Sequence, residues 1–299
     1  MLKIYLSIFI FLSMLSCIII VGKYTEVSDY RPKITASIGV FSEAVEKIGS
    51  DFVLHANVKG NNNCLQTTII NDEAFNIYLY NGLNPRETPN TLLNSSSFIS
   101  VSDNIDDEDL IKLTSKSHIY NPYFWMDVSL WIKTVSHITD ILIETTPINE
   151  QIYGRNEERY IIKLRELDEY IRTQASKIPE NKRFIVTASN SFDYFAKAYG
   201  FQTISLYNQD MDNNISFGNI IKLSEYIVEN NIKVIFKEAS ISDRYLNVLK
   251  DVLNTQNYHI DIGGTLYSDI YNHTLKNMNY TEIMIHNIDT ITNALKNKG

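Results

Sequence analysis

The chain has 299 residues, which is enough for two α/β lobes or for one large domain with a well-developed core. Hydrophobic residues make up 44% and charged residues 21% of it, as in an ordinary globular protein. The net charge is −8 and no run of Lys and Arg occurs. Because phosphate contacts need clustered cations, this composition argues against a nucleic-acid-binding protein.

Residues 1–32 are predicted to be an export segment followed by a tether. Lys3 precedes an unbroken apolar run at residues 4–21, which is the pattern of an exported protein. Three outcomes stay open: cleavage as a signal peptide, retention as an anchor of about the 20 residues that span a bilayer, or lipidation at Cys17. We expect a protein of the periplasm or of the outer face of the cytoplasmic membrane. Residues 33–299 contain one cysteine, so no internal disulfide is expected there.

The rest of the chain alternates short apolar runs with helical patterns, which predicts an α/β fold with mainly parallel sheets. The predicted strands form two sets: 34–38, 76–80 and 98–101, then 184–188, 203–206, 234–236 and 259–262. Helical patterns lie between them, for example at 42–48 and 217–230. The acidic run at residues 106–109 predicts the start of another helix, because carboxylates favour the positive end of a helix dipole.

The strongest helical signal runs from about residue 150 to residue 178. Its apolar residues recur at intervals of three and four and form one stripe, at Tyr160, Leu164, Leu167, Ile171, Ala175 and Ile178. Pro179 ends the pattern. A helix of this length is either a large crossover helix or a strut between two lobes. The strands divide evenly on either side of it, so we predict an N-terminal lobe at 33–148, a linking helix at 149–179 and a C-terminal lobe at 180–299.

Seven segments, in order, resemble the metal-specific solute-binding proteins of bacterial ABC importers, which serve zinc, manganese or iron uptake. Besides the long helix, the segments are I-G-V-F-S-E-A-V-E-K-I-G (38–49), Y-N-G-L (80–83), N-P-Y-F-W-M-D (121–127), S-F-D-Y-F-A-K-A-Y-G (191–200), I-K-V-I-F-K-E-A-S (232–240), G-G-T-L-Y-S-D (263–269) and H-N-I-D-T-I (286–291). The resemblance implies two α/β lobes, each with a small, mainly parallel sheet flanked by helices, joined by one long helix. It also implies a metal bound between the lobes, near the carboxyl ends of the strands.

Three of the four ligand positions implied by this resemblance depart from the family pattern. At the first, the segment 59–68 has no His, and Cys64 and Gln66 are the nearest donors. At the second, Tyr123 stands where the family has His. At the third, Ser189 follows the strand that ends in V-T-A-S. The fourth, the carboxylate Asp269, is retained.

The resemblance therefore predicts an altered metal site formed by Asp269, Tyr123, Ser189 and Cys64. Serine and amide oxygens are weak donors, and a tyrosine hydroxyl, with a reference pKa of about 10, is protonated near neutral pH. A high-affinity zinc site of the family type is not expected, since zinc prefers imidazole, thiolate or carboxylate. Three further residues are expected to lie around the site: Asn190, Glu238 and His118.

The function predicted from the resemblance is an exported receptor that binds a transition metal (zinc, manganese or iron) and delivers it to an ABC permease. We expect a monomer. The alternative is a divergent member that has lost metal binding and serves as a surface interaction or adhesion module. An enzyme is not expected, because the sequence has no G-x-S-x-G, P-loop or H-E-x-x-H motif.

Overall fold

The computed structural model describes residues 31–57, 76–83, 97–113, 119–206, 217–269 and 278–297. The chain divides into two units, Met1–Arg31 and Pro32–Gly299, and the second contains the fold described below. Within the described residues, no helix combines the length and the apolar character needed to cross a bilayer. The predicted export segment lies outside the described residues and stays a prediction.

The first sheet has four parallel strands in the order β2-β1-β3-β4. Its strands are β1 (Lys33–Ala36), β2 (Leu54–Asn57), β3 (Ile77–Tyr80) and β4 (Ser97–Ser100). The predictions at 34–38, 76–80 and 98–101 are confirmed as β1, β3 and β4. The sequence did not predict β2, because L-H-A-N has neither an apolar run nor a clear alternation. It lies at the sheet edge and pairs with β1 alone among the described strands.

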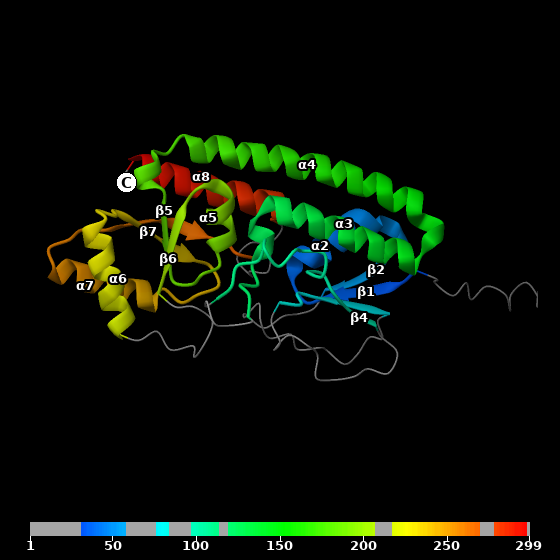
Figure 1. Cartoon of the computed structure of the whole chain (residues 1–299), viewed down its shortest axis with the longest axis horizontal. Helices are drawn as coiled ribbons and strands as arrows, with labels where there is room; N and C mark the ends of the chain where they lie inside the picture. The colour runs from blue at the N-terminus through cyan, green and yellow to red at the C-terminus, as the bar shows by residue number, and fades with distance from the viewer. Residues whose placement is uncertain are drawn as a thin grey trace, which may run out of the picture. The chain divides into compact units, whose positions relative to one another are not determined.

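The second half of the chain has two parallel strand pairs, β5–β6 and β7–β8, and β5 lies beside β7 (Figure 1). The strands are β5 (Phe184–Thr187), β6 (Gln202–Ser205), β7 (Val234–Glu238) and β8 (Asp261–Leu266). The last was predicted too early, at 259–262, because the pair Gly263–Gly264 obscured the strand pattern. A Cβ atom on Gly263 would lie 2.6 Å from side-chain carbons of Val234 and Phe236, so only glycine fits there.

Helices cover the sheets, and the longest of them contacts both halves of the fold. The helices of the described residues are α2 (Gly39–Gly49), α3 (Val128–Thr145), α4 (Glu150–Ser176), α5 (Asp193–Tyr199), α6 (Phe217–Glu229), α7 (Arg244–Thr255) and α8 (Tyr280–Asn297). Figure 1 shows α4 running beside α3 and α8. The α4 stripe predicted from Tyr160 to Ala175 is buried, as expected. The predicted fold class, with small parallel sheets joined by one long helix, is confirmed.

An aromatic cluster packs between α2, α3 and the start of α8. Phe41 of α2 lies 5.7 Å from Trp125 and 6.0 Å from Trp131, measured between ring centroids. Tyr280, the first residue of α8, lies 5.4 Å from Trp131. All four side chains are almost fully buried. The cluster therefore joins helices that come from both ends of the described chain into one core.

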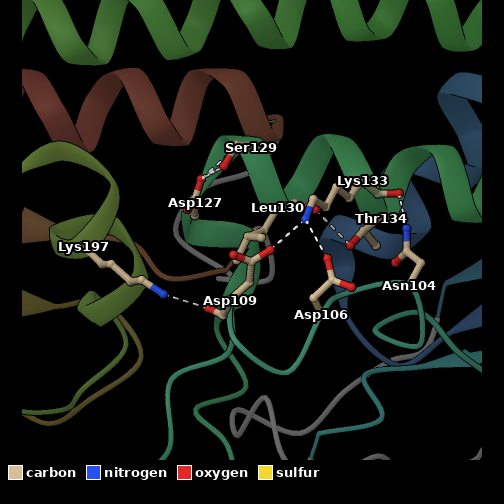
Figure 2. Close-up of polar contacts among 9 residues, drawn as sticks. All are labelled: Asn104, Asp106, Asp109, Asp127, Ser129, Leu130, Lys133, Thr134 and Lys197. Atoms are coloured by element: carbon tan, nitrogen blue, oxygen red, sulfur yellow. Dashed lines mark hydrogen bonds and ion pairs between the residues drawn. The ribbon is translucent and has the colours of Figure 1, made fainter.

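The acidic run at 106–109 forms turns, so the predicted helix start is wrong. Two of its four carboxylates pair with Lys133 of α3 instead: the Lys133 Nζ atom lies 2.7 Å from Asp109 and 3.5 Å from Asp106 (Figure 2). The Lys197 ammonium of α5 donates to the Asp109 carbonyl oxygen at 3.0 Å. The Lys133 ammonium group of α3, and not a helix dipole, thus offsets the charge of these two carboxylates. Because the pairs are exposed, each contributes about 1 kcal/mol or less.

Replacing Leu164 by alanine should destabilise the protein strongly, because this side chain of α4 is 0% exposed. We expect Leu164→Ala to lower the free energy of unfolding by about 2–5 kcal/mol. The control is Ile162→Ala on the same helix, where the side chain is 49% exposed and the expected change is within about 0.5 kcal/mol. Urea denaturation of both variants measures the difference. Equal losses would show that the α4 stripe does not form the core contact described above.

Candidate metal site

The side chain of Asn121 fixes the segment 121–127 against the loop that follows β5. Its Oδ1 atom accepts from the Tyr123 N–H at 3.0 Å, which closes a tight turn. Its Nδ2 group donates to the Asn190 carbonyl oxygen at 2.8 Å and to Asp193 Oδ2 at 3.2 Å. Asn121 is fully buried. Two of the predicted ligand segments are therefore held together by one amide group.

The pKa of Asp193, the carboxyl group that faces this amide, is raised by burial, and hydrogen bonds from Thr203 and Asn121 oppose the rise. The Thr203 hydroxyl donates to Asp193 Oδ1 at 2.7 Å. An aspartate in place of Asn121 would set a second carboxylate against Asp193 and the Asn190 carbonyl. The asparagine suits this position because it donates where the neighbouring oxygens only accept.

Tyr123 packs into the aromatic cluster. It is 6% exposed, and its ring meets the Trp125 ring edge-on at a centroid distance of 5.3 Å. The residues that follow it form the short 3₁₀ turn η3 (Phe124–Met126). Asp127 ends this turn and caps α3, accepting from the Ser129 N–H at 2.8 Å and from the Ser129 hydroxyl at 2.6 Å (Figure 2). The carboxylate of the N-P-Y-F-W-M-D motif thus stabilises the start of α3.

Trp125 contacts the residues that follow β8, so they lie beside the segment 121–127. Its indole N–H donates to the Ser268 carbonyl oxygen at 2.8 Å. The Tyr280 hydroxyl donates to the Trp125 carbonyl oxygen at 2.7 Å. Asp269, the retained carboxylate, follows Ser268 directly and is half-buried. The predicted ligand segments of Ser189 and Asp269 therefore both contact the segment of Tyr123, at residues 121–125. Three of the four predicted ligand segments thus lie together.

The first sheet borders this segment as well. Asn81, which follows β3, donates from Nδ2 to the Pro122 carbonyl oxygen at 2.9 Å. The carboxyl ends of the parallel strands β3 and β5 thus face the segment 121–123 from two sides. Ligand sites in open α/β sheets lie at such edges.

Glu238 and Ser189, predicted separately as site residues, bind each other. Ser189 donates from its backbone N–H to Glu238 Oε1 and from its hydroxyl to Glu238 Oε2, both at 2.6 Å. The Ser191 hydroxyl also donates to Oε2. Glu238 is 3% exposed, and burial raises its pKa while the hydrogen bonds from Ser189 and Ser191 oppose the rise. The carboxyl group therefore holds the loop 188–191 in place through hydrogen bonds. The sequence pattern did not reveal this role.

Cys64 and His118 lie outside the described residues, so their predicted roles stay predictions. Across the described ranges, no group of three or more His, Cys, Asp and Glu side chains is arranged to hold a metal ion. Sequence reasoning missed the bridging role of Asn121, although its place in the motif was noted. It also missed Ser191 and the Trp125–Ser268 contact, which have no local signal.

Comparisons with known proteins show what the chain is similar to. Residues 70–294 match the family described as ZnuA, zinc-uptake complex component A, periplasmic. The zinc-binding protein TroA of Treponema pallidum is 28% identical over 285 residues, covering 92% of each chain. The manganese-binding lipoprotein MntA of Bacillus subtilis is 27% identical over 280 residues, covering 90% of this chain and 91% of MntA.

A third relative is named for another metal. The iron-binding protein YfeA of Yersinia pestis is 32% identical over 153 residues, which cover 51% of this chain and 48% of YfeA. Among solved structures, the periplasmic zinc-binding protein TroA of Treponema pallidum superposes with a TM-score of 0.77 at 26% identity, covering 89% of this chain and 99% of TroA. The fold is thus shared over nearly the whole length of that structure.

Substituting Asn121 by aspartate should destabilise the protein in a pH-dependent way. Asn121→Asp removes two donated hydrogen bonds and adds a carboxylate beside Asp193, so we expect a loss of about 1–3 kcal/mol at neutral pH. The change raises the folded-state pKa of Asp193 further. The folded variant then binds protons more tightly than the unfolded chain does. Its loss in free energy of unfolding, relative to the parent protein, therefore grows as pH rises through the carboxyl pKa range.

Thermal unfolding at a series of pH values tests this expectation, with Asn247→Asp, on an exposed position of α7, as the control. The loss of stability in Asn121→Asp, relative to the parent protein, should become smaller toward acidic pH. A loss that does not change with pH would contradict the expected repulsion between two adjacent carboxylates.

Proposed function

The chain belongs to the ZnuA family of periplasmic zinc-uptake components, and on this basis we propose that it is a receptor that binds a metal ion for an ABC importer. The observation that carries the proposal is the convergence of the segments of Tyr123, Ser189 and Asp269 at residues 121–125. These are the segments in which the family resemblance locates metal ligands. A binding protein of this kind has no catalytic residues, which agrees with the absence of enzyme motifs in the sequence.

Asp269 is the ligand for which the support is strongest. It is the one carboxylate at the four expected ligand positions, and it follows a backbone carbonyl that Trp125 holds at 2.8 Å. A half-buried carboxylate at this place would supply the negative charge that a cation needs. We propose Asp269 as the anchoring ligand, with Tyr123 and the 188–191 loop beside it and Cys64 as a candidate fourth donor.

The cargo we propose is a transition metal ion, zinc, manganese or iron. Relatives of similar sequence are named for each of these metals. The metal would lie between an N-terminal lobe at 33–148 and a C-terminal lobe at 180–299, with the helix at 149–179 joining them. Since that helix contacts α2, α3 and α8, opening of the lobes would be limited in amplitude.

We propose an ABC permease in the cytoplasmic membrane as the partner, with the receptor acting as a monomer in the periplasm or on the outer face of that membrane. The apolar run at residues 4–21 supports export. MntA, a relative of nearly equal length, is named a lipoprotein, which is in keeping with lipidation at Cys17 as one of the three outcomes. Family membership favours the receptor over the interaction or adhesion module.

The metal content of the purified protein tests the proposed function. The chain is purified without chelator or histidine tag and analysed by mass spectrometry beside Asp269→Ala. We expect near-stoichiometric metal in the parent protein and a large loss in the variant, because the variant lacks the anchoring carboxylate. The control is Asp251→Ala, which removes an exposed carboxylate from α7. Metal-free parent protein with no thermal shift on adding zinc, manganese or iron would contradict the receptor and favour an interaction module.

A further inference from the structure

The start of α8 binds a carboxylate from the opposite end of the described chain. The Oε2 atom of Glu43, on α2, accepts from the Tyr280 N–H at 2.7 Å, and the two residues are 237 positions apart. Tyr280 is the first residue of α8, and its ring packs on that of Trp131 of α3. A single residue thus connects α8 to both α2 and α3.

The helix α8 does not need Glu43 in order to begin. Asn279 and Glu282 cap it reciprocally: Asn279 Oδ1 accepts from the Glu282 N–H at 3.0 Å, and the Asn279 N–H donates to Glu282 Oε2 at 2.8 Å. The Tyr280 N–H is one of the donors that a helix start leaves without a partner inside the helix. Its bond to Glu43 therefore adds a connection to α2, beyond what the helix start requires.

This connection joins elements from different halves of the fold. Along its length α8 packs on β8 and on α4, beside which it lies in Figure 1. Its first residue contacts α2 and α3 instead, so α8 reaches both halves, as α4 does. The Tyr280 hydroxyl also donates to the Trp125 carbonyl, and the Trp125 indole donates to the Ser268 carbonyl. Displacing the start of α8 would therefore loosen the residues that follow β8 as well.

The surroundings of Glu43 disfavour its charged form. Partial burial raises the pKa of Glu43, and neighbouring carboxylates add to the rise. The hydrogen bond from Tyr280 and the charge of Lys47 oppose it. The charged and titratable groups that face Glu43 come from three helices: Glu46 and Lys47 of α2, Tyr160 of α4, and Tyr280 and Glu282 of α8. The carboxyl group thus takes up a proton at a higher pH here than in water.

We propose that the Glu43–Tyr280 contact is a pH-sensitive connection between the two halves of the fold, which holds the start of α8 more firmly when the Glu43 carboxyl group is protonated. Both forms of the group keep an oxygen that can accept from the Tyr280 N–H. The protonated form avoids the cost of a partly buried charge beside Glu46 and Glu282. The inference concerns the motion of α8 and goes beyond the proposed function.

The direction of the pH dependence follows from linkage. In the connected state Glu43 binds its proton more tightly than in the open state, in which the start of α8 has left α2. The extra stability of the connected state is therefore fully present below the open-state pKa. It is lost as pH rises through the raised pKa of the connected state.

Hydrogen–deuterium exchange of the full chain tests the inference at the first turn of α8, residues 280–283. Protection factors are corrected for the intrinsic exchange rate at each pH. We expect protection in the parent protein to rise severalfold from about pH 7.5 to about pH 4.5. Residues 288–295 of the same helix are the internal reference and should show no such rise. The matched control is Glu46→Gln, an exposed position of α2, which should keep the pH dependence.

Two variants of Glu43 separate protonation from folding. Glu43→Gln keeps an accepting oxygen and cannot ionise, so its protection at about pH 7.5 should equal or exceed that of the parent protein and should not change with pH. Glu43→Ala removes the acceptor and should lower protection at every pH.

Two results would overturn the inference. One is a parent protein whose protection at 280–283 does not rise toward acidic pH. The other is a Glu43→Gln variant that loses as much protection as Glu43→Ala, because the ionised carboxylate would then be what holds α8. Neither result bears on metal binding, so the proposed receptor function is judged separately by metal content.

Discussion

The fold around the candidate site depends on the side-chain amide of Asn121, which joins segments 69 residues apart in the sequence. Its oxygen shapes the turn that leads to Tyr123, and its nitrogen binds the loop after β5. The Tyr194 hydroxyl reinforces this contact, because it accepts from the Ile111 N–H and donates to the Asn121 carbonyl, both at 3.0 Å. Asn121 Nδ2 and the Tyr194 hydroxyl thus each meet a partner from the other half of the chain, and separating the halves at this point would leave these groups unpaired.

Glu238 fixes the conformation of the 188–191 loop through hydrogen bonds, as Asn121 fixes that of the segment 121–127. A carboxylate that accepts three hydrogen bonds from one loop holds that loop more rigidly than packing alone would. The resemblance implies a metal-binding side chain at the position of Ser189, yet in this chain the serine serves the buried carboxylate.

Features with a local period were predictable from the sequence, and features made by distant polar pairs were not. The α4 stripe follows from its spacing of three and four, and the strands β1, β5 and β7 follow from their apolar runs. The strand β2 lacked such a run, and the position of β8 was obscured by two glycines. The acidic run at 106–109 was misread because its partner, Lys133, is 24 residues away from Asp109. At the candidate site, Asp269 is named from its motif alone, whereas the pairing of Ser189 with Glu238 spans 49 residues and has no sequence signature.

The core beside the candidate site is formed by aromatic side chains and helix contacts. The rings of Phe41, Trp125 and Trp131 and the contacts of α4 with α3 and α8 form the core, and none of them needs a metal ligand at position 123 or 189. The Tyr123 ring packs against Trp125 and adds to this core. The hydrogen bonds of Asn121 and Trp125 keep the segments of Tyr123, Ser189 and Asp269 in place around this core.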